Sequence, residues 1–90
     1  MMTATRPPLL QFPCSFPLKV IGLNVEEFEI QVMKIMQRHV TEADTSRCTR
    51  RFSAGNKYLA LTISFMAQSQ EQLDALYTEL NRLDVVKLTL

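Results

Sequence analysis

One histidine and two cysteines are the residues of this sequence most able to support catalysis or metal binding. His39, Cys14 and Cys48 lie on three separate segments, and no C-x-x-C motif is present. A metal site needs three or four ligands at suitable spacing, and a cysteine nucleophile needs a base that is held by a third group. Neither arrangement is found, so the sequence predicts no catalytic residue, no metal site and no cofactor.

Each of these residues also has a structural explanation. His39 follows Phe28, Val32 and Ile35 at helical spacing, which favours a core histidine, or a helix-end histidine bonded to backbone, over a ligand-binding or pH-sensing role. Cys48 is expected to fill a gap in the core. The cysteines share no motif and residues 1–11 do not resemble a secretory signal, which favours reduced thiols and a cytoplasmic location.

Composition and charge exclude several classes of function. The chain has 90 residues, a hydrophobic content of 47% and a net charge of +1, values typical of one ordinary globular domain. This charge is far from the excess that marks an obligate nucleic-acid binder. No run of about 18 apolar residues exists, so no membrane contact is expected. Gly22 and Gly55 lie too far apart to form a glycine-rich phosphate loop.

Hydrophobic periodicity divides the chain into strands and helices in alternation. Period-two alternation predicts strands at residues 16–22, 45–52, 57–66 and 84–90, and helical periodicity predicts helices at about residues 25–40 and from Ser69 to Leu83. Gly55 and Asn56 tolerate positive φ and predict a hairpin turn at residues 53–56. The last strand is expected to bury Val86, Leu88 and Leu90.

Two capping boxes are predicted at the helix starts. Asn24 with Glu27 would cap the first helix, and Ser69 with Gln72 would cap the second. On the first helix the apolar stripe is expected to face the sheet; its members are Val25, Phe28, Val32, Ile35, Met36 and His39. Ile30 lies outside this stripe and is expected to face water.

The order of elements, βαββαβ, predicts an α+β fold of the ferredoxin-like type. Two right-handed βαβ crossovers around a central hairpin give a four-stranded antiparallel sheet in the order 4-1-3-2, with both helices on one face. We expect residues 12–90 to form this single domain and residues 1–11 to form a flexible arm.

The other face of this sheet is expected to be open to water and to carry four cations and no acid. Its residues are Lys19, Ile21, Arg47, Arg51, Tyr58, Ala60, Thr62, Ser64 and Lys87. The candidate ligand or partner surface consists of Lys19, Arg47, Arg51, Tyr58 and Lys87. Such a surface suits an anion, an acidic protein or single-stranded nucleic acid, although a single aromatic residue is fewer than RNA-binding sheets present. Cations that simply solvate an exposed sheet are the alternative.

The chain also resembles the YbeD-like family of small uncharacterised bacterial proteins. The resemblance covers about residues 11–90. It rests on Phe12-Pro13 with Phe16, Lys19-Val20 with Gly22, Gln37-Arg38-His39, Gly55 with Tyr58, Thr62-Ile63, Glu71-Gln72, Tyr77 with Glu79-Leu80, and Asp84-Val85-Val86. It implies a fold similar to the ACT regulatory domain, no catalytic residues and a suspected link to lipoate metabolism. In ACT domains a glycine turn forms an effector site, and Gly22, Leu23 and Asn24 occupy the equivalent position.

The sequence therefore predicts a non-enzymatic regulatory or adaptor domain. Its partner would be a small anionic metabolite or another protein, and a homodimer is compatible with the fold. The alternative is a nucleic-acid-binding module that uses the basic sheet face. A cysteine-dependent enzyme is the least favoured interpretation.

Overall fold

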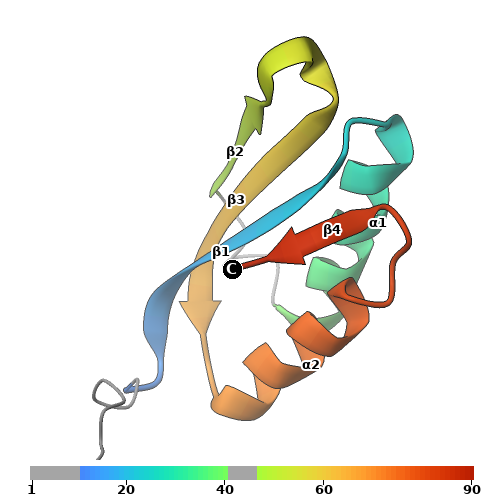
Figure 1. Cartoon of the computed structure of the whole chain (residues 1–90). Helices are drawn as coiled ribbons and strands as arrows, with labels where there is room; N and C mark the ends of the chain where they lie inside the picture. Colours follow the sequence, from blue (N-terminus) through green and yellow to red (C-terminus); the bar gives the residue numbers. More distant parts are fainter. Residues whose placement is uncertain (1–10, 41–46) are drawn as a thin grey trace, which may run out of the picture.

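The structure is a computed structural model that describes residues 11–40 and 47–90 (Figure 1). The elements in chain order are β1 (Cys14–Leu23), α1 (Glu26–His39), β2 (Arg47–Phe52), the 3-10 turn η2 (Ala54–Asn56), β3 (Tyr58–Ala67), α2 (Gln70–Leu80) and β4 (Val86–Thr89). The predicted arm, apart from Gln11, and the connection that follows α1 lie outside the described residues.

The strands form one antiparallel sheet in the order β2-β3-β1-β4, which is the predicted order read from the opposite edge. The buried residues of β1 and β3 alternate along each strand and therefore share one face, as in the opposed pairs Leu18 with Ile63 and Val20 with Leu61. Both helices contribute to the core on this face (Figure 1). The α+β ferredoxin-like arrangement is confirmed.

The start of α1 differs from the prediction. Val25 is the N-cap residue, with no side-chain hydrogen bond, and 46% of its surface is exposed. The predicted capping role of Asn24 is wrong because the hairpin engages this residue: its amide nitrogen Nδ2 donates to the carbonyl of Asn56 over 2.9 Å, and its backbone N–H donates to Lys57 over 3.0 Å. Asn24 therefore ties the β1–α1 connection to the β2–β3 hairpin.

The hairpin turn and the start of α2 follow the prediction closely. Gly55 and Asn56 both have positive φ, at 81° and 57°. The hydroxyl of Ser69 accepts a hydrogen bond from the backbone N–H of Gln72 over 3.1 Å, as an N-cap should. The side chain of Gln72 does not return to Ser69, since its oxygen accepts from the N–H of Gln68 over 2.7 Å. Half of the predicted capping box is thus present.

The last strand places its leucines on the face opposite to the predicted one. A register shift between β1 and β4 follows Gly22: this glycine pairs with Val86, but Ile21 pairs with Leu88. Lys87 is the extra residue, and a one-residue slip reverses every later side chain. Leu88 and Leu90 are consequently 49% and 59% exposed instead of buried.

Within the described residues, none of the helices is long and apolar enough to cross a membrane.

Candidate binding surfaces

The open face of the sheet is basic because its cations come from strands that contain no aspartate or glutamate. Lys19 pairs with Thr62, Arg51 with Ala60, and Arg47 with Ser64, so register places all three cations opposite the outward residues of β3. We call Lys19, Arg47, Arg51 and Tyr58 the basic open face. Arg47 and Arg51 are exposed, and Lys19 and Tyr58 are half-buried.

The strand register does not assign Lys87 to either face of the sheet. Leu88 lies opposite Ile21, and the backbone of Leu90 exchanges hydrogen bonds of 2.8 and 3.3 Å with Lys19. Lys87 is exposed at the bulge and has no paired residue in the register. Leu88 and Leu90 therefore place apolar side chains at the β4 side of the open face, next to Lys19 on β1, while Arg47 and Arg51 lie on β2.

A shallow depression lies at the hairpin end of this face. Its volume is about 180 Å³, and its lining residues are Ile21, Arg51, Phe52, Ser53, Tyr58 and Ala60. The ammonium of Lys57 lies 5.5 Å from the centre of the Tyr58 ring, within the range of a cation–π contact. Tyr58 is the one aromatic residue that the strand registers place on the open face in the described part of the chain. Stacking of several bases would require more.

A larger groove lies between α1 and the edge strand β2, and the sequence did not predict it. Its volume is about 540 Å³, and its lining residues are Asn24, Val25, Glu26, Glu29, Ile30, Met33, Lys34, Gln37, Arg50, Phe52 and Leu59. Ile30 is 48% exposed, as expected, and Phe52 is 52% exposed. In the sequence, the predicted exposure of Ile30 was the one feature that pointed to this groove. The groove itself forms where α1 lies beside the end of β2, and that arrangement depends on the tertiary structure.

Arg50 points to the helix side of the sheet and forms an ion pair in this groove. Its guanidinium donates to both carboxylate oxygens of Glu29, with a distance of 2.8 Å from Nε to Oε1. The hydrogen bond from Arg50 lowers the pKa of Glu29 below its ordinary value. The charge of Arg50 is therefore neutralised by α1, whereas Arg47 and Arg51 on the open face form no ion pair with another described residue.

Cys48 also faces the helix side, and its surroundings disfavour nucleophilic chemistry. Its thiol is half-buried, and desolvation raises its pKa in spite of the nearby positive charge of Arg50. The reactive form of cysteine is the thiolate, which a raised pKa makes rarer at neutral pH. Both Cys48 and Cys14 are free thiols in the structure.

In the predicted effector turn, close packing explains why residue 22 is a glycine. Gly22 lies inside β1, and a Cβ atom there would come within 2.4 Å of the carbonyl oxygen of Val85 and 2.5 Å of the Phe28 ring. Leu23 bonds to Val85 through its N–H over 2.9 Å. Gly22 is thus required by close packing of α1 and the β4 connection, while Asn24 lines the groove beside β2.

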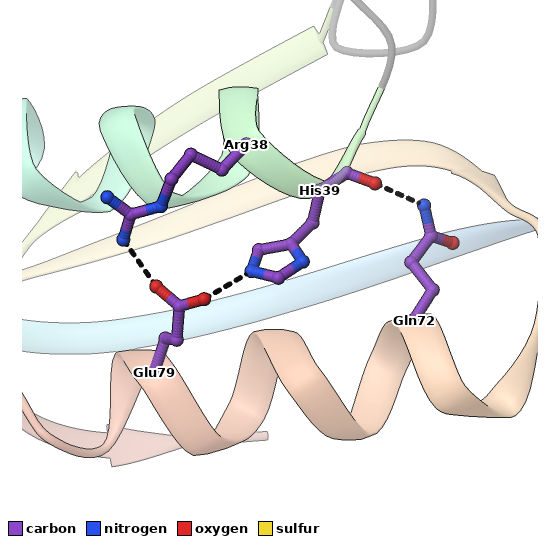
Figure 2. A network of polar contacts seen from close by, with 4 residues as sticks. All are labelled: Arg38, His39, Gln72 and Glu79. Atoms are coloured by element: carbon purple, nitrogen blue, oxygen red, sulfur yellow. Dashed lines mark hydrogen bonds and ion pairs between the residues drawn. The ribbon is translucent and has the colours of Figure 1, made fainter.

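His39 belongs to a polar cluster between the helices, which Figure 2 shows. Its Nε2 atom lies 2.5 Å from Oε2 of Glu79 on α2, and Arg38 binds the other oxygen of the same carboxylate. The backbone carbonyl of His39 accepts from Nε2 of Gln72 over 2.7 Å. Hydrogen bonds from His39 and then Arg38 lower the pKa of Glu79. The side chain of His39 therefore bonds a carboxylate, not the predicted backbone, and joins α1 to α2.

Comparison with known proteins identifies a family model and relatives that match nearly the whole chain. The family described as "Protein of unknown function (DUF493)" matches residues 7–90. A UPF0250 protein of Paraburkholderia phytofirmans is 36% identical over 89 residues, which are 99% of this chain and 100% of that protein. A UPF0250 protein of Ralstonia nicotianae is 39% identical over 88 residues, with 98% and 91% of the two chains covered.

Solved structures support the fold at much lower identity. A protein of H. pylori, known from a solution structure, has a TM-score of 0.71 and 16% identity, with 100% of this chain and 94% of that chain covered. The C-terminal domain of the MgtC protein from Mycobacterium tuberculosis has a TM-score of 0.69 and 15% identity, with 91% and 89% covered. At this identity the likeness concerns the fold alone.

Proposed function

The chain belongs to the DUF493 family of proteins of unknown function, as its YbeD-like resemblance indicated, and we propose that it is a non-enzymatic adaptor or regulatory domain. Its basic open face binds an acidic protein partner. The observation that carries this proposal is the register that gathers Lys19, Arg47 and Arg51 on one face of strands without aspartate or glutamate.

The spread of these cations favours a protein over a small anion. Lys19 lies on β1 and Arg51 on β2, with β3 between them, which separates their strands by about 10 Å. The depression on this face has a volume of about 180 Å³. Typical small-molecule pockets are larger, at roughly 300 to 1,000 Å³. An extended surface with dispersed charges is better suited to several carboxylates along a polypeptide.

A small anionic metabolite is a second candidate, favoured by the groove between α1 and β2. Its volume of about 540 Å³ lies within the small-molecule range, and Lys34 and Arg50 accompany its apolar lining. The lipoate link implied by the family resemblance would place an apolar chain with a carboxylate there. Because Glu29 already neutralises Arg50, Lys34 would supply the charge for such a ligand.

Binding of defined acidic probes tests the proposal. Fluorescence anisotropy would compare polyglutamate with single-stranded poly-dT, using wild type, the variant Lys19→Glu/Arg51→Glu, and a charge-matched control. The control is Arg38→Glu/Arg82→Glu, whose exposed cations lie at the end of α1 and just after α2. We expect polyglutamate to bind wild type and the control, and to bind the open-face variant at least tenfold more weakly. Equal binding to both variants would overturn the proposal. Tighter, strongly salt-dependent binding of poly-dT would make the nucleic-acid function the better one.

Thermal unfolding with octanoate and lipoate tests the second candidate. A ligand at 100 times its Kd adds about 2.7 kcal/mol of stability, which corresponds to a Tm shift of roughly 10 °C or more in a domain of this size. A shift of this kind that Lys34→Glu removes would support metabolite binding in the groove. No shift with either compound would leave the acidic protein as the partner class.

A further inference from the structure

The strand β2 lies at one edge of the sheet, and among the described residues β3 is its one neighbour. Ser53 donates its N–H to the carbonyl of Tyr58 over 2.9 Å, which makes this pair a hydrogen-bonded pair of the antiparallel ladder. Such pairs alternate along the strands. The N–H and C=O groups of Phe52, Arg50 and Cys48 therefore point away from β3, toward the free edge.

The side chains of β2 divide into two chemically different rows. Arg47, Thr49 and Arg51 lie on the open face, because they pair with outward residues of β3. On the other face, Glu29 neutralises the charge of Arg50. Phe52 is on the same face and is 52% exposed beside the groove. One row is basic and lacks a carboxylate partner among the described strands, and the other row is apolar with its charge neutralised.

We propose that β2 is extended by an antiparallel strand of the partner protein, with acidic residues alternating with apolar ones. This inference rests on the proposed function and specifies its partner. Successive side chains of an added strand alternate between the faces of the sheet. Its acidic residues lie opposite Arg47 and Arg51 on the open face, and its apolar residues enter the groove beside Phe52, Ile30 and Met33.

In the two antiparallel registers that pair the most residues of β2, a second copy of this chain fits the same edge poorly. If two β2 strands paired antiparallel around Thr49, Arg47 of each copy would lie opposite Arg51 of the other. If they paired around Arg50, the two copies of Arg50 would lie opposite each other. Like charges directly opposite each other destabilise a strand pair, and charged residues commonly protect edges from self-association. Charge complementarity therefore selects an acidic strand.

Synthetic peptides test this geometry directly. The first probe is a labelled peptide of alternating glutamate and valine, and its control is a peptide of equal composition with the glutamates and valines in two blocks. We expect the alternating peptide to bind at least tenfold more tightly than the block peptide. Arg47→Glu/Arg51→Glu should weaken its binding at least tenfold, and Phe52→Ser should weaken it severalfold. Folding of each variant is checked by circular dichroism.

Backbone methylation of the probe identifies strand pairing. In an antiparallel addition, the valines face Cys48, Arg50 and Phe52 and exchange hydrogen bonds with them, while the N–H groups of the glutamates point to solvent. N-methylation of the valines should abolish binding, and N-methylation of the glutamates should leave it within about twofold of the parent peptide by this pairing rule. Any other pattern would overturn the antiparallel strand addition.

The two proposals fail in different ways. If alternating and block peptides bind wild type equally and Lys19→Glu/Arg51→Glu weakens both, the basic open face binds acidic chains without strand addition. If polyglutamate and both peptides bind all variants alike, the proposed function is itself overturned.

Discussion

Leu88 lies opposite Ile21 on the open face of the sheet, one residue out of the register that alternation from Val86 predicts. Together with Leu90, these residues place apolar side chains along β1 and β4 beside Lys19, whereas Arg47 and Arg51 lie on β2. The bulge at Lys87 thus adds apolar side chains to the open face beside its cations. A partner that binds this face meets both.

The register of β4 can be tested by truncating Leu88. Because its side chain is 49% exposed, Leu88→Ala should change the free energy of unfolding by no more than about 0.5 kcal/mol. Leu76→Ala is the matched control, since Leu76 is fully buried and its truncation should cost about 2 to 5 kcal/mol. Urea unfolding measures both values. Similar losses in the two variants would contradict the shifted register.

Gly22→Ala should destabilise the domain through overpacking. The new Cβ would meet the Val85 carbonyl at 2.4 Å, and backbone cannot move aside as a flexible side chain can. A loss of about 1 to 3 kcal/mol is expected in urea unfolding. Gly55→Asn is the control, because the space around Gly55 is open and asparagine tolerates its positive φ. If both variants lost equal stability, steric contact at Gly22 would not be the cause.

The ion pair between Glu29 and Arg50 should make stability depend on pH in the acid range. The pKa of Glu29 is lower in the folded chain than its ordinary value of 4.5, so its contribution is complete above that value and is lost as the pH falls through the folded pKa. Wild type should therefore exceed Glu29→Gln in stability at pH 7, and the difference should shrink as the pH falls through the folded pKa. Arg50 is exposed, so added salt should reduce the difference at pH 7.

Urea unfolding at several pH values measures this effect. Glu26→Gln is the control, since it removes another negative charge from the first turn of α1. A difference between wild type and Glu29→Gln that grows at acid pH would contradict the lowered pKa.

Gln72 should contribute to stability by joining the two helices. Its amide nitrogen donates to the carbonyl of His39 at the end of α1, in a partly buried position (Figure 2). Gln72→Ala also removes the bond that its oxygen accepts from the N–H of Gln68, so the variant should lose about 1 to 3 kcal/mol, at about 0.5 to 1.5 kcal/mol for each bond. The comparison is Gln70→Ala, which removes an exposed bond to Asp74 on the same helix and should cost less. Equal losses would show that the contact between helices adds no stability.

Much of the fold follows from local pattern. Strict alternation along β3 predicted its buried residues, because a strand with one wet face must alternate. Ser69 predicted the start of α2, and Gly55 with Asn56 predicted the turn, since these residues suit backbone geometries that few others adopt. The same alternation predicts Lys19, Arg47 and Arg51 on the open face, where the register places them.

Other features depend on segments that meet only in the folded chain. Asn24 caps no helix because its side chain bonds to the carbonyl of Asn56 in the hairpin. The groove exists because α1 passes beside Phe52 at the sheet edge. The sequence by itself determined the order of elements, the antiparallel sheet and the placement of Lys19, Arg47 and Arg51 on its open face, because periodicity and turn chemistry are local. Only the tertiary structure decided the face of Leu88, the neutralisation of Arg50 by Glu29 and the link from His39 to Glu79, since each depends on register or packing between distant segments.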